Sequence, residues 1–208
     1  MSREKSIMSY SSSYTAYLAS VDARKAKLSA TLAEVLRTDC AFKTLEIGSG
    51  HGDFLVSYAQ RYPERFCLGI DLITQRVGKS NRKAQRLALA NCQFLKARAE
   101  ELLDCLPEQW LWTEVLIFYP DPWPKKRHHK HRLLQAPFLS QLARTVTPDA
   151  CIHFETDDVD YFESVCQTVM DHPDWQPVEV EPYIVDTFFA RVTGKQGHYA
   201  VFKQLAKG

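Results

Sequence analysis

Residues 118–132 read "FYPDPWPKKRHHKHR" and place one carboxylate directly before a run of basic side chains. Asp121 stands between Pro120 and Pro122, which fix their own φ at about −65° and remove backbone donors. We expect a stiff turn that holds the Asp121 side chain in one direction, as a catalytic carboxylate requires. A proline-rich turn with an aspartate cap is the structural alternative.

The basic run spans residues 125–132 and contains lysine, arginine and histidine only. Such runs are most often solvated surface. The chain's formal net charge is only +1, so any attraction to a polyanion must come from local clusters like this one. Because phosphates dominate affinity for nucleic acids, a basic loop beside a candidate active centre favours an RNA or DNA substrate. Its histidines do not predict a metal site, because the neighbouring lysines and arginines would repel a cation.

A second candidate site is the glycine-rich stretch "LEIGSGHGDF", residues 45–54. Gly48 and Gly50 allow a tight turn and a close approach of the backbone to a ligand. Glu46 ends the apolar run before this turn. Asp71 ends the next apolar run, at the distance from the turn at which a carboxylate can hold ribose hydroxyls. The two acids favour a cofactor site over a purely structural turn.

The choice of cofactor depends on Asp53, which stands where a dinucleotide-binding turn would have its third glycine. A carboxylate near a helix N-terminus would repel a pyrophosphate. Glu46 suits a cationic ligand, and S-adenosyl-L-methionine carries an ammonium and a sulfonium but no phosphate. These residues favour a methyltransferase, with a nicotinamide oxidoreductase as the alternative.

The elements that must position these residues alternate between strand and helix. Apolar runs typical of strands occur at "KTLEIG", "FCLGID", "CQFLKA", "EVLIFYP" and "CIHFET". The stretches between them are long enough for crossover helices, which predicts a mostly parallel sheet with helices on both faces. The last apolar run, "GHYAVFKQ", follows with little room for another crossover, so we expect it to pair antiparallel near the end of the sheet.

The chain of 208 residues, 45% of them hydrophobic, is long enough for one sizeable core. Apolar spacing predicts a helix over residues 14–37. We expect residues 1–14 to form a mobile arm and residues 15–208 to form one domain. Six cysteines without a C-x-x-C pair are interpreted as reduced, mostly buried thiols. The absence of a signal-peptide pattern and of a long apolar run predicts a cytoplasmic protein.

Five motifs in this order resemble the bacterial tRNA (guanine-N7)-methyltransferase family. They read "LEIGSGHGDFL", "GIDL", "FYPDPWPKKRHHKHRL", "FETDDVDYFE" and "TFFARVTGKQGH" and cover residues 42 to about 202. The resemblance implies a Rossmann-like class I methyltransferase fold, with a seven-stranded sheet that has one antiparallel strand. It also implies S-adenosyl-L-methionine as cofactor and N7 of a guanine in the tRNA variable loop as acceptor. We expect tRNA as partner, no metal, no membrane, and a monomer or weak homodimer.

The resemblance assigns roles residue by residue. Asp121 would be catalytic and would lie between cofactor and guanine. The cofactor would be bound by Glu46, Gly48, Gly50, Asp71, Arg98 and Asp121. The substrate would be bound by Lys125, Arg127, Asp157, Thr187 and Arg191. Two positions depart from the family pattern: Arg98 replaces a hydrogen-bond acceptor expected near the adenine, and Ala190 replaces a glutamate.

Guanine N7 carries a lone pair and no proton, so its methylation requires no general base. We expect Asp121 to bind guanine N1–H and N2–H and to favour the developing positive charge. Trp123, Phe188 and Phe189 are candidates to stack on a displaced base. The alternatives are a non-catalytic RNA-binding homologue and a class I methyltransferase with another acceptor.

Overall fold

The computed structural model of the chain describes residues 2–179 and 197–205. In this part of the chain a seven-stranded sheet has the order β3-β2-β1-β4-β5-β7-β6. The strands are β1 (Phe42–Ile47), β2 (Arg65–Asp71), β3 (Cys92–Lys96), β4 (Trp112–Phe118), β5 (Val146–Thr156), β6 (Trp175–Val178) and β7 (His198–Gln204). Each predicted apolar run therefore forms a strand.

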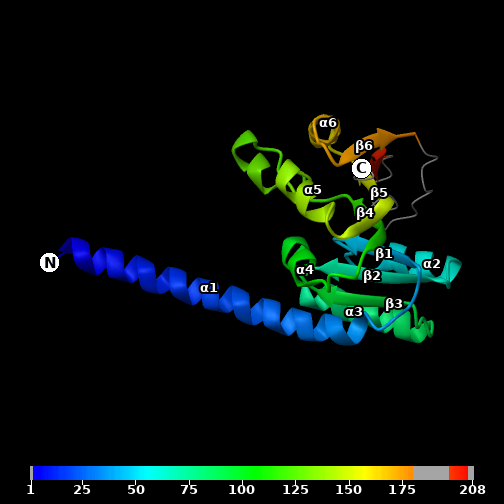
Figure 1. The fold of residues 1–208 in the computed structure, drawn as a ribbon, viewed down its shortest axis with the longest axis horizontal. Coiled ribbons are helices and arrows are strands. Elements are labelled where there is room, and N and C mark those ends of the chain that lie inside the picture. The colour runs from blue at the N-terminus through cyan, green and yellow to red at the C-terminus, as the bar shows by residue number, and fades with distance from the viewer. Residues whose placement is uncertain (1, 180–196, 206–208) are drawn as a thin grey trace.

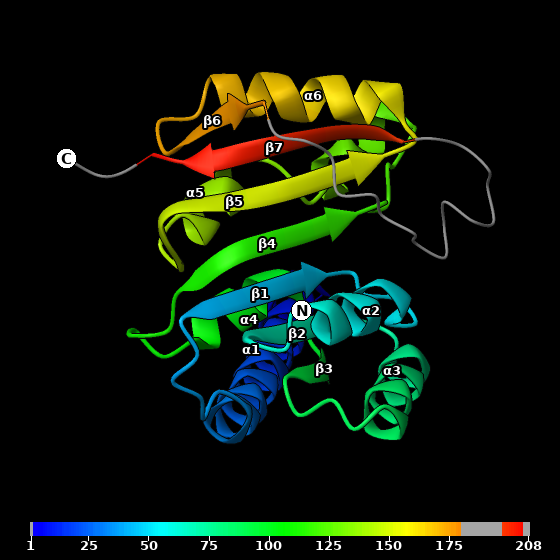
Figure 2. The same ribbon diagram turned by 90° about the vertical axis from the view of Figure 1, so that its right-hand side faces the viewer.

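Strand directions follow the prediction. Strands β1 to β5 are parallel to one another, whereas β7 runs antiparallel to both β5 and β6 (Figure 2). The run "GHYAVFKQ" is thus one strand from the edge, inserted between β5 and β6. The mostly parallel sheet with one antiparallel strand is confirmed.

Helices cover both faces of the sheet (Figure 1). They are α1 (Ser2–Val35), α2 (Asp53–Arg61), α3 (Thr74–Arg86), α4 (Ala99–Cys105), α5 (Ala136–Leu142) and α6 (Val159–Met170), with a 3-10 helix η1 (Lys126–His131). Helices α1, α4, α5 and α6 bury their apolar side chains in one cluster, and α2 and α3 do so in another.

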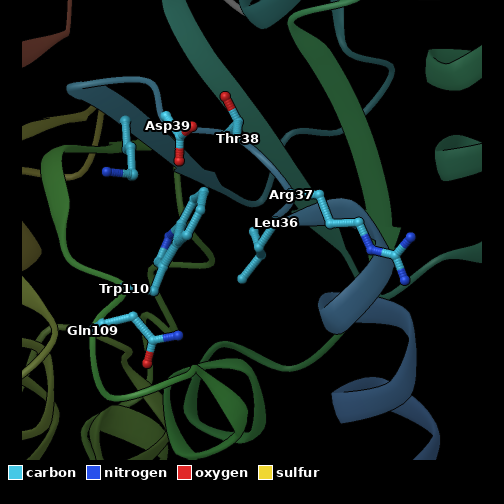
Figure 3. Close-up of a pocket in the computed structure, with 7 residues that line it drawn as sticks. Leu36, Arg37, Thr38, Asp39, Gln109 and Trp110 are labelled. Atoms are coloured by element: carbon cyan, nitrogen blue, oxygen red, sulfur yellow. The ribbon is translucent and has the colours of Figure 1, made fainter.

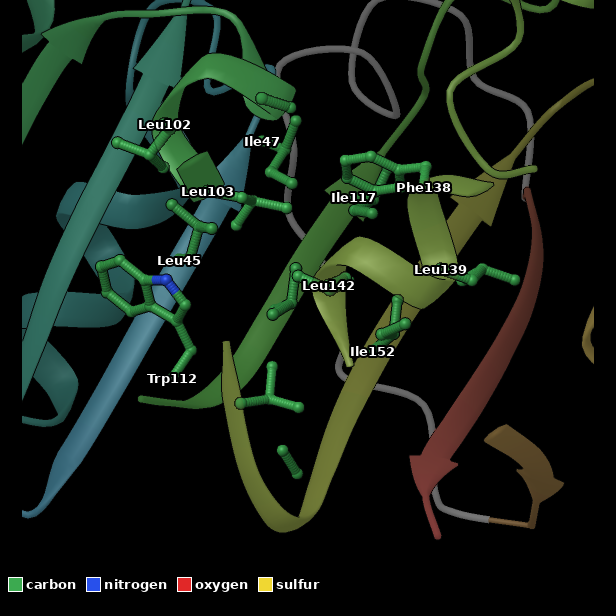
Figure 4. Close-up of a cluster of buried hydrophobic side chains, with 14 of the residues drawn as sticks. Leu45, Ile47, Leu102, Leu103, Trp112, Ile117, Phe138, Leu139, Leu142 and Ile152 are labelled. Atoms are coloured by element: carbon green, nitrogen blue, oxygen red, sulfur yellow. The ribbon is translucent and has the colours of Figure 1, made fainter. Parts of the chain in front are cut away.

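The two clusters arise because side chains alternate along each strand. In β4, Val115 and Ile117 face the larger cluster, whereas Leu116 and Phe118 face the smaller one. Figure 4 shows part of the larger cluster, in which Ile117 and Ile152 of the sheet lie near the side chains of α5. This continuous apolar run on a central strand is typical of a parallel sheet covered on both faces.

Helix α1 begins at Ser2, inside the segment expected to form a mobile arm. Its C-terminal part packs against the larger apolar cluster through Leu28 and Leu32, as does Leu36 directly after the helix, and the rest of α1 extends away from the sheet (Figure 1). The predicted helix over residues 14–37 is present but starts earlier. The mobility of the first residues stays a prediction.

The six cysteines are free thiols, but only Cys67 and Cys92 are buried; the other four are partly exposed, so the expectation of mostly buried thiols is wrong. Among the described residues, no helix is long and apolar enough to span a membrane.

Candidate active site at the carboxyl edge of the sheet

Four predicted site segments meet at one edge of the sheet. Strands β2, β1, β4 and β5 are neighbours and parallel, with Ile47 opposite Ile117 and Phe118 opposite Glu155. The turns after these strands therefore lie side by side. The strand order reverses direction between β1 and β4, and open α/β sheets bind ligands at such a switch point.

The glycine turn after β1 is shaped by left-handed backbone at Gly48 (φ 81°) and Gly50 (φ 54°). Backbone N–H groups of Gly48 and Ser49 donate to the Ile70 carbonyl at 2.9 Å, which fastens the turn to β2. A side chain at Gly48 would meet no described atom within 4 Å. The Gly48 backbone is thus open to a ligand, and its glycine is required by φ.

Asp71 at the end of β2 has a structural role that sequence reasoning missed. Its carboxylate oxygens accept hydrogen bonds from the backbone N–H of Gly50 at 3.1 Å and of Ile73 at 2.7 Å. The Arg76 guanidinium lies 3.6 Å away. Because an ionised carboxylate offers about four acceptor positions, Asp71 can hold the turn and still accept a ribose hydroxyl.

Glu46 is the most unusual acid of the site. Its side chain is buried, with 4% of the residue exposed, and burial with nearby Asp53 and Asp71 raises its pKa to about 8. Among the described residues, its Oε2 atom and the buried Ser49 hydroxyl find no hydrogen-bond partner. Buried polar atoms are normally paired, so this arrangement fits a cationic, hydrogen-bonding ligand such as S-adenosyl-L-methionine.

Asp53 is the first residue of α2 and is paired with Lys83 of α3 at 2.6 Å. The ammonium of Lys83 also donates to the His51 carbonyl. The charge of Asp53 is therefore balanced, and its repulsion of a phosphate is weaker than the sequence alone indicates.

Arg98 is exposed at the N-cap position of α4, directly after β3. It lines a hollow of about 960 Å³ together with Leu72, which follows Asp71. Helix α1 supplies the opposite wall through Tyr17 and Lys27. Arg98 thus lies near the predicted cofactor site, on a side that α1 borders.

The turn that carries Asp121 is conformationally unusual. Tyr119 and Trp123, each directly before a proline, have positive φ values of 49° and 48°. A non-glycine residue with such a left-handed backbone costs about 1–3 kcal/mol of conformational free energy, and such residues concentrate at functional sites. Asp121 between them is exposed at the carboxyl end of β4. The turn is present where it was predicted, whereas its stiffness and the catalytic role of Asp121 stay predictions.

Beside Asp121, the Trp123 side chain is 37% exposed. Its ring lies against His131 and His128, with centroid distances of 5.2 and 6.0 Å. An exposed indole supported by two imidazoles is a suitable platform for a nucleic-acid base.

The basic run forms the 3-10 helix η1, and its members do not share one role. Lys125 and Arg127 are exposed. Arg132 is instead withdrawn, with 3% of its side chain exposed. It donates to the Pro122 carbonyl at 2.8 Å and to Asp160 at 2.6 Å. Arg132 therefore anchors the loop to α6 and to the Asp121 turn, while the cations before it remain available to a ligand.

Asp157 follows β5 directly and is exposed beside the Asp121 turn. Thr187 and Arg191, like Phe188 and Phe189, lie outside the described residues. The predicted residues Glu46, Gly48, Gly50, Asp71, Asp121 and Asp157 are thus gathered at one edge. Sequence reasoning missed Ser49 and the anchoring role of Arg132, because the first is one residue among many in a turn and the second is hidden in a charge run.

A comparison of the sequence with models of known protein families assigns this chain to a family. The family model described as "Putative methyltransferase" matches residues 41–203. The chain belongs to this methyltransferase family. The match covers nearly the same residues as the motif resemblance and includes all five motifs.

Curated relatives of this chain confirm the resemblance to tRNA (guanine-N7)-methyltransferases. A tRNA (guanine-N(7)-)-methyltransferase from Caulobacter vibrioides is 37% identical over 132 residues, which are 64% of this chain and 58% of the relative. One from Chromohalobacter salexigens is 35% identical over 153 residues, or 72% and 62%. The matches thus span about three fifths of these relatives' length.

Solved structures confirm the class I methyltransferase fold. The 16S rRNA methyltransferase KamB matches with a TM-score of 0.60 at 18% identity, over 84% of this chain and 92% of the other. An rRNA methylase from Streptococcus thermophilus matches with a TM-score of 0.57 at 13% identity, over 86% and 94%. The TM-scores establish the fold. At such low sequence identities, they do not show which molecule accepts the methyl group.

A second hollow, of about 610 Å³, lies at the opposite edge of the sheet (Figure 3). It is lined by the end of α1, the start of β1 and Trp110 before β4. Lys43 lies over the Trp110 ring at 5.0 Å, and Arg37 points away from it. Because parallel sheets bind ligands at the carboxyl ends of their strands, we do not assign the catalytic site here. Among the described residues, no group of three or more His, Cys, Asp or Glu side chains could hold a metal ion.

Proposed function

We propose that this chain transfers a methyl group from S-adenosyl-L-methionine to N7 of a guanine in tRNA, in the variable loop, and acts in the cytoplasm where tRNA is found. The observation that carries the proposal is the position of the exposed Asp121, next to the glycine turn and followed by the basic loop. The curated relatives, which are named as tRNA (guanine-N(7)-)-methyltransferases, support the same reaction.

The cofactor region supports a cationic nucleoside. The open Gly48 backbone permits close approach, Asp71 can accept from ribose, and Glu46 with Ser49 offers buried groups that await a partner among the described residues. When bound, S-adenosyl-L-methionine supplies an electrophilic methyl group. The buried Glu46 carboxylate would attract its positive charge in a site where water does not screen the interaction.

The chain's own contribution to the methyl transfer is alignment and electrostatics. N7 has a free lone pair, so no residue has to remove a proton. Asp121, held by the strained turn, would accept hydrogen bonds from guanine N1–H and N2–H and would stabilise the cationic purine that forms. Lys125 and Arg127 would contact phosphates, and Trp123 would stack on a base that has left the helix.

The test is incubation of the purified chain with labelled S-adenosyl-L-methionine and bulk tRNA, followed by nucleoside digestion and mass spectrometry. We expect 7-methylguanosine as the labelled product. A parallel reaction with ribosomal RNA controls for another RNA acceptor. Label in a different nucleoside, or in ribosomal RNA alone, would contradict the proposed acceptor.

A further inference from the structure

Directly before Asp121, the ends of strands β4 and β5 are joined by a half-buried pair of side chains, Tyr119 and Glu155. The Tyr119 hydroxyl donates to Glu155 Oε1 at 2.6 Å. The Tyr119 backbone N–H donates to the Glu155 carbonyl at 2.7 Å. Two hydrogen bonds from one residue to another fix both the backbone and the ring of Tyr119, which has the left-handed φ of 49°.

A third segment meets the same pair. Gly197, just before β7, lies so close that a Cβ atom there would be 2.7 Å from Glu155 Oε1 and 2.9 Å from the Tyr119 hydroxyl. Its backbone N–H also lowers the pKa of both groups by hydrogen bonding. Because only glycine leaves room at this point, the residue lets the start of β7 close over the Tyr119–Glu155 pair.

The pair lies just upstream of two predicted site residues. Asp121 follows Tyr119 through Pro120, and Asp157 follows Glu155 through the buried Thr156. A small rotation at Tyr119 would therefore move Asp121, and one at Glu155 would move Asp157, so the bond between the two residues couples the positions of the carboxylates. Strained backbone persists only where surrounding contacts impose it, and the contacts of Tyr119 to Glu155 and Gly197 are among those that do so.

We propose that Tyr119, Glu155 and Gly197 form a clamp that positions Asp121 and Asp157 relative to each other for methyl transfer. The three are positioning residues, and the inference rests on the proposed function. Burial is the main cause that raises the pKa of both Tyr119 and Glu155. The phenol therefore keeps its proton and remains the donor at neutral pH.

The test compares Tyr119→Phe with Tyr62→Phe, a control that also loses one hydroxyl but lies at the end of α2, at the amino edge of β2. With tRNA and S-adenosyl-L-methionine saturating, we expect Tyr119→Phe to lower the single-turnover rate roughly ten- to a hundredfold, the scale of a small misplacement. Cofactor affinity, the KM for tRNA and the melting temperature should stay near those of the control. Gly197→Ala should reproduce the loss of rate by forcing the pair apart.

Amide hydrogen exchange supplies a readout that does not need turnover. Tyr119→Phe should speed exchange in peptides covering residues 119–124 and 197–200, with no change in Tyr62→Phe. Unaltered rate and exchange in Tyr119→Phe would overturn the clamp, as would an equal loss of rate in Tyr62→Phe. If the unmodified protein methylates no tRNA, the proposed function fails, and the exchange experiment alone decides whether the clamp holds the two turns.

Discussion

Glu46 shows how a single residue can couple proton and cofactor binding. Its pKa of about 8 means that the buried carboxyl is mostly protonated at neutral pH before a ligand arrives. A cationic ligand favours the carboxylate, so binding below about pH 8 should release a proton. We expect affinity for S-adenosyl-L-methionine to rise between pH 6 and 8 by up to roughly tenfold per pH unit. Calorimetry in buffers of different ionisation enthalpy measures the proton release directly.

The matched variant Glu46→Gln keeps the shape of the side chain and cannot titrate. Its cofactor affinity should be weak and independent of pH over the same window. A slope that is equal in both proteins would assign the pH dependence to another group and remove Glu46 from the cofactor site.

The same residue also predicts a pH dependence of stability without ligand. The folded chain keeps the Glu46 proton up to about pH 8, whereas the unfolded chain loses it near the ordinary glutamate pKa of 4.5. The stability that this group contributes is therefore complete below pH 4.5 and is lost as pH rises through about 8. The slope is at most ~1.4 kcal/mol per pH unit. Thermal or urea unfolding from pH 5 to 9 should show this decline relative to Glu46→Gln; parallel curves would contradict the raised pKa.

At the scale of the element, the residues of the basic loop have two roles. Lys125, Lys126 and Arg127 are exposed and available to a ligand, whereas Arg132 holds the loop in place. Replacement of Lys125, Lys126 and Arg127 by alanine should weaken tRNA binding and leave cofactor affinity unchanged. Each lost phosphate contact should flatten the slope of log K against log salt by about 0.7–0.9. Filter binding at several salt concentrations measures this slope. An unchanged slope would show that these three residues do not contact phosphates and are ordinary solvated surface.

Arg132 should behave in the opposite way, although it belongs to the same run. Arg132→Ala removes the bonds to the Pro122 carbonyl and to Asp160 as well as the contact of the guanidinium with the Tyr161 ring. We expect a loss of stability of about 1–3 kcal/mol from these charged hydrogen bonds. The triple alanine variant is the control and should unfold at nearly the original temperature. Equal stability of the two variants would contradict the division of the loop.

At the scale of the whole molecule, the sequence predicts the strands of the sheet better than it predicts the structure of the N-terminal segment. Apolar runs and the lengths between them suffice for six of the strands and their directions, because buried parallel strands have to be continuously apolar. The short strand β6 was not among these runs. The start of α1 was missed because its serine- and tyrosine-rich residues lack the apolar spacing on which helix prediction depends.

In the candidate site, too, the sequence predicts some residues but not the contacts between distant segments. Glu46, Asp71 and Asp121 could be predicted because each stands at the end of an apolar run. The Tyr119–Glu155 pair could not be predicted, since it depends on the register between β4 and β5. The burial of Arg132 was equally hidden, because its partner Asp160 comes from a helix far along the chain. That Glu46 Oε2 finds no hydrogen-bond partner within the described part of the chain can be recognised only once its surroundings are known.

The central claim is that Asp121 serves the methylation of guanine in tRNA and is more than a turn cap. Asp121→Asn keeps the shape and the capping ability of the side chain but removes its charge and turns an amide donor toward the donors of guanine. The decisive measurement is the single-turnover rate of 7-methylguanosine formation in tRNA by Asp121→Asn, set beside its melting temperature. We predict a rate lower by roughly a hundredfold or more, the scale of a lost electrostatic contact in an active site, with a melting temperature close to the original. A near-normal rate at a near-normal melting temperature would contradict the catalytic role of Asp121.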